Sequence, residues 1–148
     1  MPASDDKDKD ILIKAWEVMQ SLAKSNAESA WQIRAWGISV WAALMAYGYS
    51  NDKSEIFLVA IVLLVVVFLM ELSVRQIQYK FIERSLEIES CINSLLVGDG
   101  WSLPAKGIST EIDTPNSYDF FGLFIIKRWL IWMPYLLVLL ATAIALAL

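Results

Sequence analysis

The sequence predicts an all-α integral membrane protein, with three transmembrane helices and a small helical cytoplasmic layer. Composition is the first reason: 57% of the 148 residues are hydrophobic and the mean hydropathy is +0.53, more apolar than an ordinary soluble domain of this size. Distribution is the second, because the apolar residues gather in three runs whose connections carry the charge density of a soluble surface. Tryptophan and tyrosine near the ends of two runs are the third, since amphipathic rings favour the membrane interface.

Residues 1–30 are predicted to form a cytoplasmic tail and an amphipathic helix. The opening MPASDDKDKD lacks the basic region and the apolar segment of a secretory signal, so we expect a frayed tail there. From residue 11 to residue 33 the apolar positions lie mostly three or four apart, as on one face of a helix. These positions are Leu12, Trp16, Met19, Leu22, Ala23, Ala30 and Ile33. We expect this helix to continue without a break into the first span.

Residues 31–74 are predicted to form a transmembrane hairpin, with spans at 31–50 and 56–74 joined by the turn NDKSE. The second span is the clearest, because the uncharged run IFLVAIVLLVVVFLM and its extension to Val74 approach the roughly 20 residues that cross a bilayer. Arg34 interrupts the first span near its start, and this span crosses if the side chain snorkels to the headgroups. A helix lying flat on the membrane is the alternative, but it requires a charged face that residues 35–50 lack.

Residues 75–124 are predicted to form a cytoplasmic helix and a loop, with the second span continuing directly into the helix. Apolar residues recur there at heptad-like intervals, while the charged ones fall largely on other faces. Five apolar residues are predicted to form an oligomer interface: Ile77, Phe81, Ile88, Ile92 and Leu95. The alternative is that this stripe packs on the N-terminal helix of the same chain. Segment 98–114 is rich in Gly, Ser, Thr, Asp and Pro, which predicts a loop.

Residues 125–148 are predicted to form the third transmembrane helix. Upstream of it, Thr114 as N-cap and Pro115 as first helical residue indicate a helix start, and the aromatic residues that follow are placed to lie along the bilayer surface. The apolar run itself begins at Trp129, directly after two basic residues. Small residues at helix-packing spacing predict close contacts in lipid, namely Ala42 with Ala46, Ser39 with Ala43, and Ala141 with Ala145.

The basic residues predict one orientation in the membrane. Five precede or open the first span, one lies in the turn between the first two spans, six lie between the second and third, and none follows the third. The side richer in Lys and Arg is normally cytoplasmic. We therefore expect a multi-pass protein of the bacterial inner (cytoplasmic) membrane, with its N-terminus in the cytoplasm and its C-terminus outside.

This topology brings Arg34 level with Glu71 at the cytoplasmic rim of the hydrocarbon. An unpaired carboxylate at that depth costs free energy, and a basic partner lowers the cost. We therefore predict an interfacial ion pair between Arg34 and Glu71, with Arg75, Lys127 and Arg128 as rival partners.

Residue counts exclude several kinds of chemistry. With no histidine and a single cysteine, Cys91, the chain lacks the commonest metal ligand and has no internal disulfide. The net charge of -4 and the dispersed basic residues argue against nucleic-acid binding. Because no nucleophile is paired with a base, we predict no enzyme, no catalytic residue, no metal site and no cofactor. Membrane lipid is the first expected partner.

The order of these segments resembles small bacterial membrane proteins of antiphage systems. The chain combines a short charged N-terminus, two spans joined by NDKSE, the long polar helix QIQYKFIERSLEIESCINSLL and a third span. It is most similar to the SLATT and RipA-like groups, although the third span and the segment GISTEIDTP depart from the plain two-span SLATT pattern. The resemblance implies a homo-oligomer that acts as a membrane-perturbing effector in defence, and these groups have no catalytic signature to carry over.

Two functions follow as hypotheses. The first is a homo-oligomeric inner-membrane effector that forms a pore or leak when its cytoplasmic layer receives a signal, and whose uncharged spans would make the pore a hydrophobic constriction. The second is a membrane scaffold or accessory subunit without a pore. It would recruit a cytosolic partner through the helix 75–96 and the loop 98–114.

Overall fold

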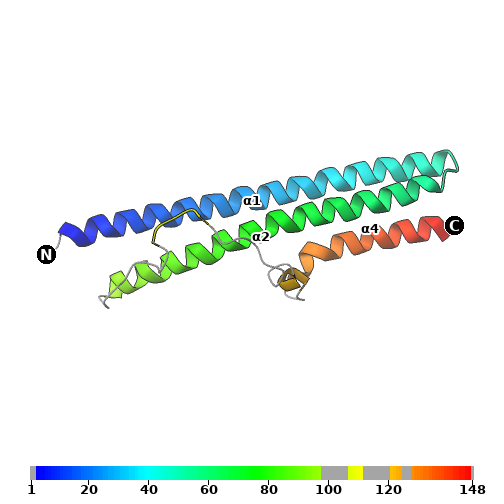
Figure 1. Cartoon of the computed structure of the whole chain (residues 1–148). Coiled ribbons are helices and arrows are strands. Elements are labelled where there is room, and N and C mark those ends of the chain that lie inside the picture. The colour runs from blue at the N-terminus through cyan, green and yellow to red at the C-terminus, as the bar shows by residue number, and fades with distance from the viewer. Residues whose placement is uncertain (1–2, 98–106, 112–120, 125–127, 148) are drawn as a thin grey trace. The chain divides into compact units, whose positions relative to one another are not determined.

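The computed structural model describes residues 3–97, 107–111, 121–124 and 128–147 (Figure 1). Helix α1 spans Ala3–Ser50, α2 spans Glu55–Val97 and α4 spans Trp129–Ala147, with a short 3-10 helix, η1, at Gly122–Phe124. No strand occurs in the described ranges, so the predicted all-α class is confirmed for them. Several predictions lie outside these ranges: the helix start at Thr114 and Pro115, most of the loop 98–114, and Lys127.

The N-terminal segment differs from the expected frayed tail. Helix α1 already begins at Ala3 and runs unbroken to Ser50. A helix incurs the unfavourable nucleation step once, after which each added residue gains one hydrogen bond. Extending a long, packed helix towards the N-terminus therefore costs little, even through a charged stretch.

Local hydrogen bonds close the turn between α1 and α2. The N–H of Lys53 donates to the carbonyl of Gly48 at 3.0 Å, and Asp52 adopts a left-handed backbone with φ 53°. This arrangement satisfies carbonyls that would otherwise be free at a helix C-terminus. Glu55 places a negative charge in the first turn of α2, where the helix dipole favours it. The NDKSE segment thus lets α2 return directly beside α1.

The chain divides into two compact units. The first unit consists of Met1–Ala27 and Ile77–Thr114, and the second of Glu28–Gln76 and Pro115–Leu148. The division falls close to residues 30 and 75, where the sequence predicts the change from cytoplasmic to membrane segments.

An apolar cluster between α1 and α2 holds the first unit together. Leu12, Met19 and Ile88 are almost fully buried at its centre. Side chains of α1 contribute at the three- and four-residue spacing seen in the sequence, so both helices present a continuous apolar face to each other. A polar contact adds to this packing, because Gln20 Nε2 donates to Ser85 Oγ at 3.0 Å.

The five residues predicted to form an oligomer interface all lie in this cluster. Phe81 and Ile88 are buried, and Ile77, Ile92 and Leu95 pack against the buried residues. The structure therefore shows the stripe in its alternative arrangement, packed on the N-terminal helix of the same chain. The physical reason is that α1 extends far enough towards the N-terminus to cover the stripe, although Ile77, Ile92 and Leu95 remain half-buried.

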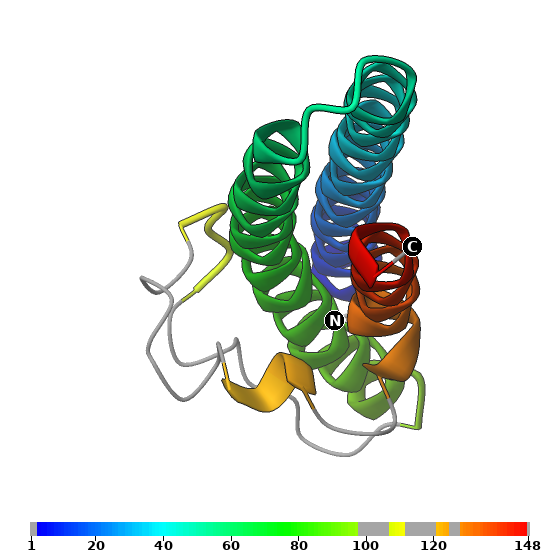
Figure 2. The same cartoon turned by 90° about the vertical axis from the view of Figure 1, so that its right-hand side faces the viewer.

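In the second unit, α4 lies alongside α1 and α2 (Figure 2). Two glycines set the close approach of α1 to α2: a Cβ at Gly37 would lie 2.3 Å from Val67 Cγ1, and one at Gly48 would lie 2.9 Å from the Phe57 ring. The small residues that the sequence predicts at helix contacts do not set this close approach. Within the chain, five of the six are exposed: Ser39, Ala42, Ala43, Ala46 and Ala141.

Two helices in the described part of the chain, α2 and α4, are long and apolar enough to cross a membrane. Only 33% of the apolar stretch of α2 and 17% of that of α4 is buried within the chain, unlike the core helix of a soluble fold. The first predicted span, residues 31–50 of α1, does not reach the same apolar character. It contains Arg34, Gln32, two glycines and many aromatic residues in place of leucine and valine.

Candidate functional site

The structure brings the predicted partners Arg34, on α1, and Glu71, on α2, together inside the second unit. Arg34 Nη2 donates to Glu71 Oε1 at 2.6 Å, and Arg34 Nε donates to Glu71 Oε2 at 2.9 Å. Two parallel contacts of this kind fix the orientation of a guanidinium and a carboxylate. Arg34 is 7% exposed and Glu71 is 0% exposed. The first span was predicted to cross if Arg34 snorkelled to the headgroups. The side chain instead stays between the helices, where Glu71 compensates its charge.

Helix α4 contributes a phenol to this pair. The Tyr135 hydroxyl donates to Glu71 Oε2 at 2.6 Å, and its ring lies beside the guanidinium, with 5.7 Å between Arg34 Cζ and the ring centroid. The Trp31 ring lies near the same Cζ, at 5.8 Å. A guanidinium within about 6 Å of an aromatic face is attracted by the ring quadrupole. The rings therefore surround the cation with favourable apolar groups instead of water.

Two backbone carbonyls of α4 complete the surroundings of Arg34. The Leu130 carbonyl accepts from Nη1 at 3.1 Å, and the Ile131 carbonyl accepts from Nη2 at 3.0 Å. Leu130 stands four residues before Pro134, which lies inside α4 and has no N–H to donate. Pro134 therefore leaves the Leu130 carbonyl without a helical donor, and Arg34 binds this carbonyl.

Arg75, which the sequence analysis considered as a rival to Arg34, also binds Glu71. Its Nε lies 3.2 Å from Glu71 Oε1, one helical turn further along α2. Another rival, Arg128, instead donates Nη1 to the carbonyl of Gly122 at 3.2 Å. We call the connected set the Arg34 network: Arg34, Glu71, Arg75, Tyr135 and the carbonyls of Leu130 and Ile131.

The Arg34 network is suited to fix the register of three helices. A buried ion pair adds little net stability, because the attraction is offset by the cost of removing both charges from water. Removing one partner is strongly destabilising, because the other charge remains buried without compensation. Both oxygens of Glu71 accept hydrogen bonds from groups on α1, α2 and α4. A shifted helix would break several of these contacts at once.

A second polar contact joins α1 to α4. Trp41 Nε1 donates to Thr142 Oγ1 at 3.0 Å, and the Thr142 hydroxyl donates to the carbonyl of Val138 at 2.9 Å. Thr142 is fully buried. Helix α4 is therefore attached to α1 at two levels by hydrogen bonds, with the apolar residues Leu64 and Val67 packed with Tyr135 between α2 and α4.

In the first unit, the buried polar side chain of Arg84 ties the segment 107–111 to α2. Arg84 forms an ion pair with Glu87 and donates Nη2 to the carbonyl of Gly107 at 2.5 Å. Gly107 has φ 64°, a left-handed backbone that glycine adopts without steric cost. This contact gives part of the predicted loop a defined position on the first unit.

Sequence reasoning missed Pro134, Tyr135 and the Trp41–Thr142 contact. One signal was present: a proline inside an apolar helix frees the carbonyl four residues earlier, and such a carbonyl requires a donor. No local pattern shows which distant side chain supplies that donor.

These observations define an all-helical protein with two helices long and apolar enough to cross a membrane, and with a buried Arg–Glu network at the contact of three helices. Comparison with protein-family models, curated proteins and solved structures gives no match.

Proposed function

We propose that the chain is an inner-membrane protein that crosses the bilayer three times, through residues 31–50 of α1, residues 56–74 of α2, and α4. The pairing of Arg34 with Glu71 supports a crossing by α1, because it compensates the charge within that segment. Large side chains of the same segment are exposed, as expected for contact with lipid: Trp31, Trp36, Val40, Tyr47 and Tyr49. The distribution of basic residues supports a cytoplasmic N-terminus and an outer C-terminus.

Cysteine labelling in a Cys91→Ser background tests this topology. We expect Lys53→Cys and Leu148→Cys to react with a membrane-impermeant maleimide added to spheroplasts, and Asp10→Cys and Lys106→Cys to react only after lysis. Labelling of Asp10→Cys in intact spheroplasts would refute the orientation. Labelling of Asp10→Cys and Lys53→Cys from the same side would refute a crossing by α1.

We further propose that the protein is a homo-oligomeric effector that perturbs membrane permeability on a cytoplasmic signal, as in bacterial antiphage defence. The observation that carries this proposal is the position of the charges. Among the described residues of the three proposed spans, the charged ones are Arg34 and Glu71, and both are held where α1, α2 and α4 meet. The exterior of these spans is therefore uncharged, while their interior holds an ion pair.

The same geometry offers a route from a closed to a leaky state. Displacing α4 removes the Leu130 and Ile131 carbonyls and the Tyr135 hydroxyl from Arg34 and Glu71. The exposed pair then draws water to the cytoplasmic rim of the hydrocarbon, and several copies arranged around one axis would give a leak path a polar entrance there. The first unit, built on the same two long helices, is the part available to a cytoplasmic signal.

Ion flux in proteoliposomes made of phosphatidylethanolamine and phosphatidylglycerol tests the leak. Tyr135→Phe removes one hydrogen bond to Glu71 and keeps the ring. A hydrogen bond to a charged group is worth about 1.5–3 kcal/mol, so we expect about 10- to 150-fold more flux than wild type. Tyr47→Phe, at an exposed tyrosine of α1, is the matched control. Equal ion flux through the two variants would count against the proposal. So would the absence of flux from wild type and from both variants.

The scaffold hypothesis is favoured by a different observation. The first unit carries exposed apolar side chains, which offer a docking surface for a cytosolic protein: Ile11, Val18, Leu86, Leu96 and Val97. A soluble partner that is retained by wild type and lost by Leu86→Asp, together with an absence of ion flux, would select this function over the effector.

A further inference from the structure

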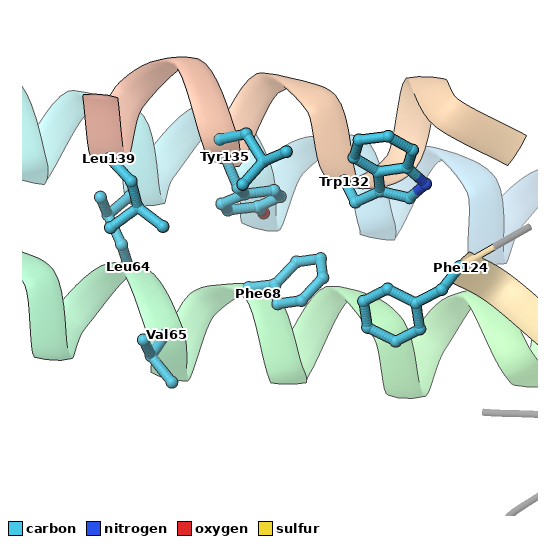
Figure 3. A pocket seen from close by; sticks show the side chains of 8 residues that line it. Leu64, Val65, Phe68, Phe124, Trp132, Tyr135 and Leu139 are labelled. Atoms are coloured by element: carbon cyan, nitrogen blue, oxygen red, sulfur yellow. The ribbon is translucent and has the colours of Figure 1, made fainter. Parts of the chain in front are cut away.

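A cavity of about 200 Å³ lies between α2 and α4 in the second unit (Figure 3). Phe124 of η1 and Trp132 line one end, and Leu64, Val65 and Leu139 line the other. Phe68 and the ring of Tyr135 form the middle, with 4.8 Å between their centroids. The surface that faces the cavity is apolar, and the Tyr135 hydroxyl is bound to Glu71. An apolar hollow of this size offers water no hydrogen-bond partners and accommodates hydrocarbon.

Arg128 lies near the aromatic end of this cavity. Arg128 donates Nη1 to the carbonyl of Gly122 at 3.2 Å, and Gly122 begins the same 3-10 turn that carries the lining residue Phe124. Phe124 in turn packs edge-on against Phe68, with 5.9 Å between ring centroids. Arg128 is therefore held next to the turn that supplies one wall of the cavity, and a guanidinium with five N–H donors binds several acceptors at once.

We propose that this cavity binds part of one acyl chain of an anionic phospholipid, with the lipid phosphate on Arg128. The cavity supplies apolar walls and no polar group to orient a polar ligand, which fits a segment of hydrocarbon. Arg128 supplies a positive charge directly before the span, at the level of the headgroups. This site rests on the proposed membrane location of α2 and α4, and it is independent of whether the protein conducts ions.

A bound chain would also support the Arg34 network. The ring of Tyr135 forms one wall of the cavity while its hydroxyl holds Glu71. A chain in the cavity adds dispersion contacts to that ring, because an empty space offers no partners for them. The lipid thus strengthens the attachment of α4 to the hairpin.

Native mass spectrometry of the full chain in detergent tests the site, with phosphatidylglycerol and phosphatidylcholine of identical chains as probes. Leu139→Trp fills the cavity and should abolish retention of phosphatidylglycerol, whereas Leu140→Trp, at an exposed neighbouring position, should not. Arg128→Gln should weaken phosphatidylglycerol retention about fivefold, the effect of one basic residue at an anionic membrane surface, and leave phosphatidylcholine unchanged. Arg128→Lys should restore most of the retention.

Equal retention by Leu139→Trp and Leu140→Trp would overturn the cavity assignment, and equal retention of both lipids by wild type would overturn the role of Arg128. Circular dichroism confirms that each variant is folded. Solubility separates the lipid site from the membrane proposal. A chain that stays soluble without detergent contradicts the membrane location. A chain that needs detergent but binds no lipid selectively contradicts only the lipid site.

Discussion

Replacing Glu71 by alanine is expected to destabilise the second unit by about 3–5 kcal/mol, because Arg34 then remains buried without its carboxylate. The Tyr135 hydroxyl and Arg75 lose the same acceptor. Unfolding in detergent by a denaturant series, followed by circular dichroism, measures the change. Glu55→Ala, at the exposed start of α2, is the control and should change the free energy of unfolding by less than about 1 kcal/mol. A similar effect for both variants would show that Glu71 is solvated.

Charge reversal separates the ion pair from the rest of the network. Arg34→Glu and Glu71→Arg should each be as damaging as Glu71→Ala, and the double variant should recover only part of the loss. The reason is that Glu at position 34 would face the carbonyl oxygens of Leu130 and Ile131, to which it has no hydrogen to donate.

Pro134→Ala sharpens this test. It supplies the N–H that the Leu130 carbonyl lacks within α4, so it should increase the recovery of the double variant. If the double variant is no more stable than the worse single change, with or without Pro134→Ala, Arg34 and Glu71 are not energetic partners.

Ile88→Asp is expected to separate α1 from α2 in the first unit. Ile88 is fully buried in the cluster with Leu12 and Met19, so an Asp there places a carboxylate among apolar side chains. Burying the charge, together with the lost packing, should cost about 3 kcal/mol or more. Hydrogen exchange of residues 7–24 and 77–95 should lose protection, while exchange in the second unit should change little.

Leu86→Asp is the matched control, because Leu86 lies two residues away on the same helix and is 56% exposed. This pair also tests self-association. If a second copy docks on the exposed side of the first unit, Leu86→Asp should reduce the oligomer size measured by light scattering without loss of exchange protection. If Ile88→Asp dissociates the oligomer while residues 7–24 stay protected, the stripe acts between copies and not within the chain.

The sequence alone determined the features that depend on local pattern. The apolar runs predicted three spans, of which α2 and α4 are confirmed as long and apolar enough to cross a membrane. The three- and four-residue spacing of apolar side chains predicted the packed face of α1, and the NDKSE segment predicted the reversal between α1 and α2. Arg34 and Glu71 were also predicted as partners, because a hairpin with a short turn places positions equally far from its turn at the same height. These properties need no knowledge of distant contacts.

Only the tertiary structure decided which surfaces meet. The stripe from Ile77 to Leu95 had to be buried, but its spacing is the same whether the partner helix belongs to the chain or to another copy. Likewise, Pro134 shows that a carbonyl of α4 is free, yet its donor, Arg34, stands 96 residues away from Leu130. The close approach at Gly37 depends on the position of Val67 on α2. Such contacts join residues that are unrelated in sequence, so local propensity and hydropathy carry no signal for them.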